Sequence, residues 1–181
     1  ASVVVSANDT EKELLTYGVT PEIVDVLHPD VTSGEFITEE QEVASERVAV
    51  LGKDAVETFF GENALPVGEL ISINNTTFRV VGVLESSSVL AGGFLNNSIY
   101  IPINVVVDQI LGEEKLQEID ISVHDPNTIN QTIEDTQNLL RERHELKEGD
   151  ENDFQIHSAQ DILKTVQTIT GLLTVMIAAI S

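Results

Sequence analysis

The sequence lacks several things on which common folds and functions depend. No cysteine occurs among its 181 residues, which excludes disulfides, zinc ribbons and thiol catalysis. Tryptophan is absent too, and aromatic residues make up only 4% of the chain. Hydrophobic residues nevertheless reach 41%, so one sizeable core or two small ones must be built from valine, isoleucine and leucine. This composition favours strands.

Basic residues are also scarce. The chain has 9 Lys and Arg against 31 Asp and Glu, a formal net charge of -22. Because affinity for DNA, RNA and anionic membrane surfaces comes mainly from Lys and Arg, the charge excludes nucleic acid as a partner and argues against an anionic membrane surface. We interpret it as a very soluble exterior; the alternative is a surface that recruits basic partners or divalent cations.

The glycines of a phosphate-binding loop are missing as well. The stretch RVAVLGKDAVETFFG, residues 47–61, reads as strand, turn and helix, but only Gly52 lies at the turn. Nucleotide loops need G-x-G-x-x-G or G-x-x-x-x-G-K-[ST]. Here Lys53 follows the glycine directly, and Asp54 would place a negative charge where a phosphate binds. We therefore predict a structural turn and no nucleotide site, with a short helix that buries Val56, Phe59 and Phe60.

Candidate catalytic chemistry is sparse. None of the four histidines has H-E-x-x-H spacing, and only His124 and His157 are expected on neighbouring strands, where zinc would need further ligands. The acidic run Glu148–Asp153 resembles a calcium loop in charge but lacks its alternating ligand pattern. Ser86–Ser88 has no G-x-S-x-G elbow. We predict no catalytic, cofactor-binding or metal-binding residue; a hydrolase with an unidentified acidic pair is the least favoured alternative.

The chain divides into three parts by its patterns. Residues 1–32 hold one or two strands and a helix that starts at Pro21. Residues 33–112 are rich in strands, with a capping box at Thr38 and Gln41, a hairpin turn at Asn74–Asn75 and a helix from Asn104 to Leu111. Alternation within these strands implies a sheet with one covered face.

The last part, residues 113–168, predicts strand, helix, strand, helix. The expected elements are a strand at 119–124, a helix over 128–144, a strand at 154–158 and a helix with a capping box at Ser158 and Asp161. This order is half of a split βαβ, ferredoxin-like module. From Gly171 the sequence is apolar on every side for about half the roughly 20 residues that a bilayer span requires, so we interpret 169–181 as the start of a truncated transmembrane helix, with a buried helix as the alternative.

Six blocks follow one another along almost the whole chain: YGVTPE, SGEFIT, RVAVLG, FFGENALPVGELISINNTTFRVVGVL, IYIP and ITGLLTVMIAAIS. Their order and spacing resemble the periplasmic core domain of MacB-type ABC transporter permeases, relatives of the FtsX and LolC/LolE proteins. Two departures stand out. Glu35 occupies a position where the family often has Arg, and a first strand and helix that the family's domain normally has are missing before Ala1.

This resemblance implies an α+β fold with two lobes. Residues 1–32 and 113–168 would form a discontinuous "porter"-like βαβ lobe whose N-terminal part is missing, and residues 33–112 a strand-rich "sabre"-like lobe. The domain would lie on the extracytoplasmic face of the cell membrane, between two helices of a four-helix permease. Five N-x-[ST] sequons, at Asn8, Asn74, Asn75, Asn96 and Asn130, agree with that location.

The resemblance also implies a function and partners. The domain would be noncatalytic and would couple cytoplasmic ATP hydrolysis to work outside the membrane by mechanotransmission, in export of a peptide, antibiotic or lipoprotein or in activation of a partner. Expected partners are the cognate ABC ATPase, a second permease subunit and an extracytoplasmic adaptor or substrate protein, while the isolated domain is expected to be a monomer. The alternative is a secreted or cell-surface ligand-binding module.

Overall fold

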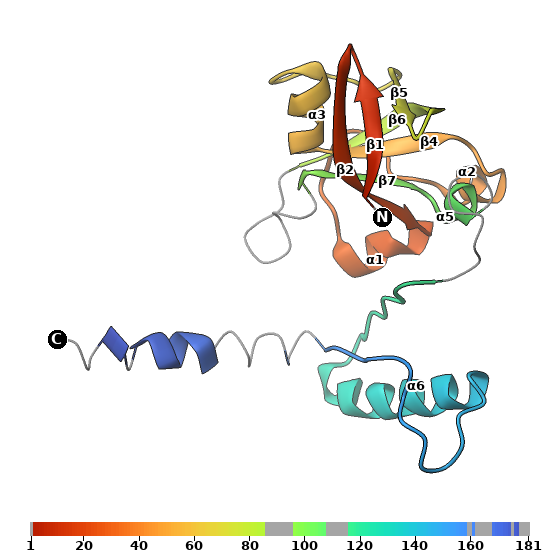
Figure 1. Ribbon diagram of the computed structural model, residues 1–181, viewed down its shortest axis with the longest axis vertical. Helices are drawn as coiled ribbons and strands as arrows, with labels where there is room; N and C mark the ends of the chain where they lie inside the picture. The colour runs from red at the N-terminus through yellow and green to blue at the C-terminus, as the bar shows by residue number, and fades with distance from the viewer. Residues whose placement is uncertain are drawn as a thin grey trace. The chain divides into compact units, whose positions relative to one another are not determined.

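The computed structural model divides the chain into two compact units, Ala1–Ser122 and Val123–Ser181 (Figure 1). It describes residues 2–85, 96–107, 116–158, 161, 168–174, 176 and 177. The first is called unit 1 and the second unit 2. Strands and helices are both present, so the expected α+β class is confirmed.

Unit 1 is built on a sheet whose described strands run in the order β3-β6-β4-β7-β2-β1-β5. Their bounds are β1 (Ser2–Ala7), β2 (Thr10–Val19), β3 (Val31–Gly34), β4 (Val48–Gly52), β5 (Leu70–Ile73), β6 (Thr76–Leu84) and β7 (Ser98–Pro102). The strand β6 pairs in parallel with β4 and antiparallel with β5. Because β5 also pairs with β1, six of these strands close into a ring and leave few open edges.

Both tight hairpins depend on asparagine. The turn between β1 and β2 has Asn8 at φ 47° and Asp9 at φ 61°, and the turn between β5 and β6 has Asn74 at φ 46° and Asn75 at φ 65°. Positive φ at both central residues is the signature of the two-residue turns that match strand twist, and Asn tolerates it well. The predicted hairpin turn at Asn74–Asn75 is thereby confirmed.

The core of unit 1 consists of two clusters on opposite faces of the same strands. Strand β4 is buried at every residue because Ala49 and Leu51 face one cluster, whereas Val48 and Val50 face the other. The first cluster holds Phe78, the largest of the fully buried side chains. The alternation expected in LISI is present in β5, where Ile71 and Ile73 are buried, but the expectation of one covered face is wrong for β6, which is buried at every residue from Val80 to Leu84.

Gly34 and Gly82 let β3 and β6 approach closely. They are partners in the antiparallel register, and Gly34 has φ +73°. A Cβ on Gly34 would lie 2.0 Å from the carbonyl oxygen of Val81, and one on Gly82 would lie 2.1 Å from that of Glu35. Neither position has room for a side chain, which is a common reason for glycine inside a strand.

Short helices cover the strands of unit 1. They are η1 (Pro21–Ile23), α1 (Val24–Leu27), α2 (Glu39–Val43), α3 (Lys53–Phe60) and α5 (Ile103–Val105). The predicted start at Pro21 is confirmed, and so is the capping box, in which Gln41 N donates to Thr38 Oγ1 at 3.3 Å while Gln41 Oε1 accepts from Thr38 N at 3.0 Å.

The predicted cap at Asn104 is wrong. Pro102 is the N-cap of α5, because the proline ring already fixes an extended residue before the helix. The Asn104 side chain instead donates to the Glu42 carbonyl at 3.2 Å and connects α5 to α2. Most of the expected helix beyond Val107 and the Ser86–Ser88 loop with its glycines lie outside the described residues.

The N-terminal strands belong to the sheet of unit 1. We assigned residues 1–32 to a lobe shared with residues 113–168, whereas β1 and β2 pair with β5 and β7 in the sheet of unit 1. The parallel pairing of Leu15–Val19 with Ser98–Pro102 could not be read from local patterns, because parallel partners are distant in sequence.

Unit 2 contains η3 (Pro126–Thr128) and α6 (Ile129–Arg143), so the helix predicted over 128–144 is confirmed. The strands predicted at 119–124 and 154–158 are wrong, since both segments are irregular. An extended segment forms a strand only where a neighbour satisfies its backbone groups, and the described residues supply none here. None of the side chains of α6 is fully buried.

Candidate functional site

The turn at Gly52 has a structural role in unit 1. Strand β4 runs directly into α3, with Gly52 as the N-cap in an extended conformation at φ -70°. The helix buries Val56 and Phe59 in the core of unit 1, as predicted, whereas Phe60 is only partly buried against it. No loop lies between strand and helix, so the backbone does not form the multi-residue cradle that phosphate loops use.

The acidic loop of unit 2 is organised around an arginine. The Arg141 guanidinium donates to the carbonyl oxygens of Lys147 at 2.7 Å and Asp150 at 3.0 Å, and also to the Asn152 side chain. Lys147 N donates in turn to the Asp150 carboxylate at 2.8 Å. Oxygen atoms of the loop that could otherwise bind a calcium ion therefore accept hydrogen bonds from the Arg141 guanidinium.

The histidines lie in different local structures. His144 contacts Asp153 through Nδ1 at 2.8 Å and Phe154 edge-on, and His157 contacts Gln155 at 3.2 Å, both within unit 2. His28 ends α1 in a left-handed conformation. Among the described residues, no three His, Asp or Glu side chains lie close enough to hold a metal ion. We expected His124 and His157 on neighbouring strands, but neither of these strands is formed.

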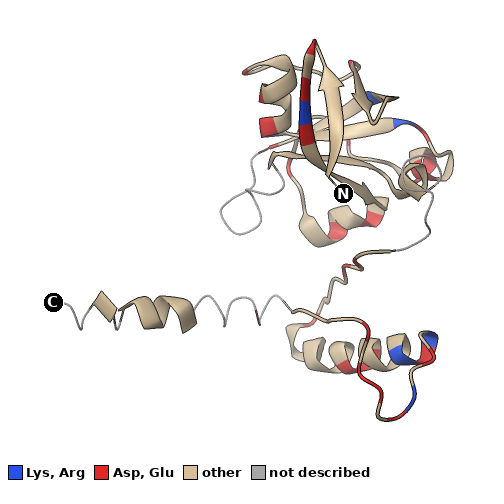
Figure 2. Cartoon of the chain, viewed as in Figure 1, with Lys and Arg blue, Asp and Glu red and all other residues tan. Residues whose placement is uncertain are grey.

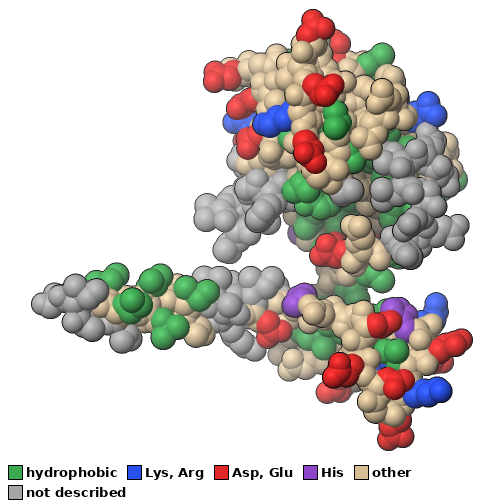
Figure 3. Space-filling view, viewed as in Figure 1, with side chains coloured by type: hydrophobic (Ala, Val, Ile, Leu, Met, Phe, Trp, Pro, Cys, Tyr) green, Lys and Arg blue, Asp and Glu red, His purple; other side chains and the backbone are tan. Residues whose placement is uncertain are grey.

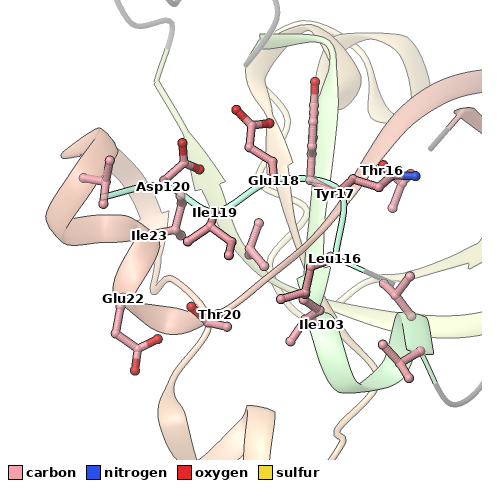
Figure 4. Close-up of a pocket in the computed structure, with 16 residues that line it drawn as sticks. Thr16, Tyr17, Thr20, Glu22, Ile23, Ile103, Leu116, Glu118, Ile119 and Asp120 are labelled. Atoms are coloured by element: carbon pink, nitrogen blue, oxygen red, sulfur yellow. The ribbon is translucent and has the colours of Figure 1, made fainter. Parts of the chain in front are cut away.

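Sequence reasoning missed a groove in unit 1. Its hollow measures about 350 Å³ and lies between the end of β2, the helices η1, α1 and α5, and an extended segment at residues 116–120 (Figure 4). This volume falls near the lower end of the range of about 300–1,000 Å³ that small-molecule sites occupy. We call residues 116–120 the strap.

Apolar side chains form most of the groove surface. The helices contribute Ile23, Val26, Ile103, Val106 and Val107, and the strap contributes Leu116 and Ile119. Leu116 is 63% exposed and Ile119 61% exposed, so both present apolar surface to water. Gly18 sets the position of one wall, since a Cβ there would lie 2.5 Å from Cγ2 of Val106.

An aromatic stack supports the groove beside β2. The rings of Tyr17 and Tyr100 stack with centroids 5.6 Å apart, and Phe36 packs against Tyr100 at 6.1 Å. Tyr100 is only 3% exposed, and burial, with a smaller contribution from Tyr17, raises the pKa of its phenol above the usual range. Tyr17 lines the groove and is partly exposed.

Every charged residue that lines the groove is acidic. They are Glu22, Glu118 and Asp120, and all three are exposed at its rim. A hydrogen bond from the Thr20 side chain, with a smaller backbone contribution, lowers the pKa of the Glu22 carboxyl, so Glu22 is anionic at neutral pH. Acidic residues also predominate on the rest of the chain (Figure 2).

Comparison with known proteins assigns this fold to a family. A family model described as the MacB-like periplasmic core domain matches residues 1–139. The chain belongs to the MacB-like periplasmic core domain family. Domains of this family are the extracytoplasmic parts of MacB-like ABC transporters, so the resemblance inferred from the six sequence blocks is confirmed.

Individual relatives agree with this family. The chain is 32% identical over 172 residues to the macrolide export ATP-binding/permease protein MacB of Rhodopseudomonas palustris, covering 94% of this chain and 26% of that protein. It is 27% identical over 165 residues to MacB of Bdellovibrio bacteriovorus, covering 91% and 25%. The chain therefore spans about a quarter of the length of these relatives.

Solved structures share the fold. The periplasmic region of MacB from Actinobacillus actinomycetemcomitans matches with a TM-score of 0.77 at 23% identity, covering 92% of this chain and 72% of that one. The extracellular domain of the ABC-type transporter YknZ from Gram-positive bacteria matches with a TM-score of 0.71 at 20% identity, covering 81% and 73%. None of the helices formed by the described residues combines the length and apolarity that crossing a bilayer requires.

Proposed function

We propose that this MacB-like domain is the noncatalytic part of an ABC permease that couples cytoplasmic ATP hydrolysis to work outside the membrane by mechanotransmission. The observation that carries the proposal is the family match over residues 1–139. Relatives that share this region are named ATP-binding/permease proteins, and this chain corresponds to about a quarter of each. ATP hydrolysis belongs to a nucleotide-binding domain, separate or fused, outside this chain.

The closed ring of unit 1 supports a mechanical role. A domain that transmits motion must move as a body, and six strands joined edge to edge around an aliphatic core resist bending better than an open sheet does. Strand β3 pairs with β6, with Gly34 opposite Gly82, and so adds a further strand to the same framework. Unit 1 is therefore the rigid element, corresponding in its central part to the sabre-like lobe.

Unit 2 and the terminal helix are the connection to the membrane in this proposal. The apolar side chains Leu172, Leu173, Met176 and Ile177 are each more than half exposed, and hydrophobic side chains gather along this helix in Figure 3. In the proposal, this apolar pattern is the start of a transmembrane helix.

The partners follow from this placement. They are the cognate ABC ATPase, a second copy of the permease and an extracytoplasmic adaptor or substrate protein, with a peptide, antibiotic or lipoprotein as the class of cargo. Most of the dimer contact lies in the membrane part, so the isolated 181-residue chain is a monomer. Sedimentation of the isolated chain checks this point, and a tight dimer would contradict it.

A distance measurement in the full-length transporter tests the proposal. The chain contains no cysteine, so Glu57→Cys on the exposed side of α3 gives one spin label in each copy of the domain. We expect the distance between the two labels to change when ATP is added. A transporter whose ATPase cannot bind ATP is the matched control and shows no change. Equal distances with and without ATP in the active transporter would refute mechanotransmission.

One observation favours a second candidate function. The groove in unit 1 has the size and apolar lining of a small-molecule site, which agrees with the alternative of a ligand-binding module. Saturable binding of a small molecule to the groove would favour this second candidate if it left the ATP-dependent change in the distance between the two labels unaffected.

A further inference from the structure

The groove combines two properties that select one class of ligand. Its floor is apolar, formed by branched aliphatic side chains such as Ile23 and Val106, so it favours an apolar body. Its rim carries three carboxylates, and neither Lys nor Arg is among the lining residues. An anion entering this groove would meet only like charge, whereas a cation would meet opposite charge.

The carboxylates come from both sides of the opening. Glu22 belongs to η1, while Glu118 and Asp120 belong to the strap. In Figure 4 the side chains of Glu118 and Tyr17 point the same way, and both line the groove. Since one face of the Tyr17 ring is stacked on Tyr100, the side chain is held in place and can support a cation near its other face.

We propose that this groove binds a small amphipathic cation, an ammonium group on an apolar body of medium length. The apolar body lies between Ile119 of the strap and Val106, which follows α5, and the ammonium lies at the rim near Glu118 and Asp120. The proposal goes beyond the mechanical function, because binding to unit 1 requires neither a membrane nor ATP. Its failure and the failure of mechanotransmission are therefore seen in different experiments.

The chain contains its own reporter for this groove. Tyr17 and Tyr100 are its two tyrosines, and it has no tryptophan. Both rings lie in the stack beside the groove, so the tyrosine fluorescence of the whole protein reports on this one region. A ligand that displaces water from Tyr17 changes this signal, whereas binding in unit 2 leaves it unchanged.

The test compares three eight-carbon probes: n-octylammonium and octanoate, each below its micelle concentration, and n-octanol below its solubility limit. Tyrosine fluorescence and calorimetry are measured on the full 181-residue chain. We expect saturable binding of octylammonium, weaker binding of octanol and none of octanoate. Octanoate binding as tightly as octylammonium, or no saturable binding of octylammonium, would overturn the proposal.

Exposed residues allow variants that keep the fold. Glu118→Gln and Asp120→Asn should each weaken octylammonium binding about two- to fivefold, as expected for exposed ion pairs, and leave octanol binding unchanged. Ile119→Ser should weaken both probes, because it removes apolar surface from the groove wall. Glu148→Gln in unit 2 is the control and should change neither. Equal effects of Glu118→Gln and Glu148→Gln would place the cation elsewhere and refute this site.

Discussion

The two units of the chain are stabilised in different ways. In unit 1, strand β4 is buried at all of its residues, and two apolar clusters pack on its opposite faces. In unit 2, the 15-residue α6 has no buried side chain, and Arg141 on this helix makes polar contacts with the loop that follows it. Unit 1 therefore contains what it needs to fold, whereas unit 2 presents surface that other parts of a transporter can cover.

The difference explains why the same kind of sequence pattern has different outcomes. In unit 1, alternating segments found neighbours and became strands. In unit 2, a segment such as 154–158 has the same alternation without a partner among the described residues and is irregular. An alternating sequence favours a strand, but the strand forms only where another strand pairs with it.

The largest effect should come from the core of unit 1. Phe78→Ala removes the largest fully buried side chain, and a cavity of this kind costs about 3–5 kcal/mol of unfolding free energy. Leu139→Ala on α6, where the side chain is 51% exposed, is the matched change in unit 2 and should cost less than about 1 kcal/mol. Urea unfolding followed by circular dichroism measures both, and equal losses would break the comparison.

Glycines with positive φ give the second contrast. Gly34→Ala must fit a Cβ 2.0 Å from the Val81 carbonyl oxygen, and we expect it to destabilise unit 1 by about 3 kcal/mol. Gly149→Ala in unit 2 has a similar φ of +96° and no neighbouring atom within 4 Å, so it should cost only about 1 kcal/mol. Thermal unfolding of the two variants tests whether close approach, rather than φ alone, requires the glycine in β3.

High pH should affect unit 1 through Tyr100. Burial raises the pKa of this phenol, so above pH 10 the unfolded chain loses a proton that the folded chain keeps, and stability falls as pH rises. Each pH unit above about 10 removes at most about 1.4 kcal/mol. Tyr17→Phe isolates the absorbance of Tyr100 in a pH titration. Ionisation of Tyr100 at its ordinary pKa in the folded protein would contradict its burial.

The capping box should give a smaller change. Thr38→Ala removes the hydroxyl that accepts from Gln41 N and should cost about 1 kcal/mol. Thr38→Ser keeps the hydroxyl and is the control, with a loss well below that of alanine. Chemical denaturation of the pair shows whether the cap or the size of the side chain matters.

The smallest global effect is expected in unit 2. Arg141→Leu removes the donor that holds the loop carbonyls of Lys147 and Asp150, so amide exchange in residues 145–153 should become faster while β4 and β6 are unchanged. Arg143→Leu on the same helix, whose side chain makes none of these bonds to the loop, is the control. Faster exchange in unit 1 would show that the units are more coupled than we propose.

Much of unit 1 could be predicted because its signals are local. The Asn74–Asn75 turn, the capping box at Thr38 and the helix start at Pro21 depend on residues within a few positions of each other. The pairing of β2 with β7 and the pairing of β5 with β1 depend on contacts between distant segments, and neither leaves a local pattern.

The groove was missed for a related reason. Tyr17 and Gly18 lie in the block YGVTPE, which the family resemblance marked, but no local pattern connects them with Val106 or with the strap. The sequence feature that could have indicated the groove is the pair Leu116 and Ile119, two apolar residues in an otherwise polar stretch. Their exposure became apparent only once the fold placed them at the rim of a hollow.

Hydrogen exchange of the full-length transporter in a membrane, with and without ATP, tests the central claim most directly. If unit 1 moves as a rigid body, amides of β4 and β6 exchange at the same rate in both states, whereas amides of α6 and the terminal helix change. Exchange that changes within β4 and β6 but not in unit 2 would contradict the account, because unit 1 would then deform instead of transmitting motion.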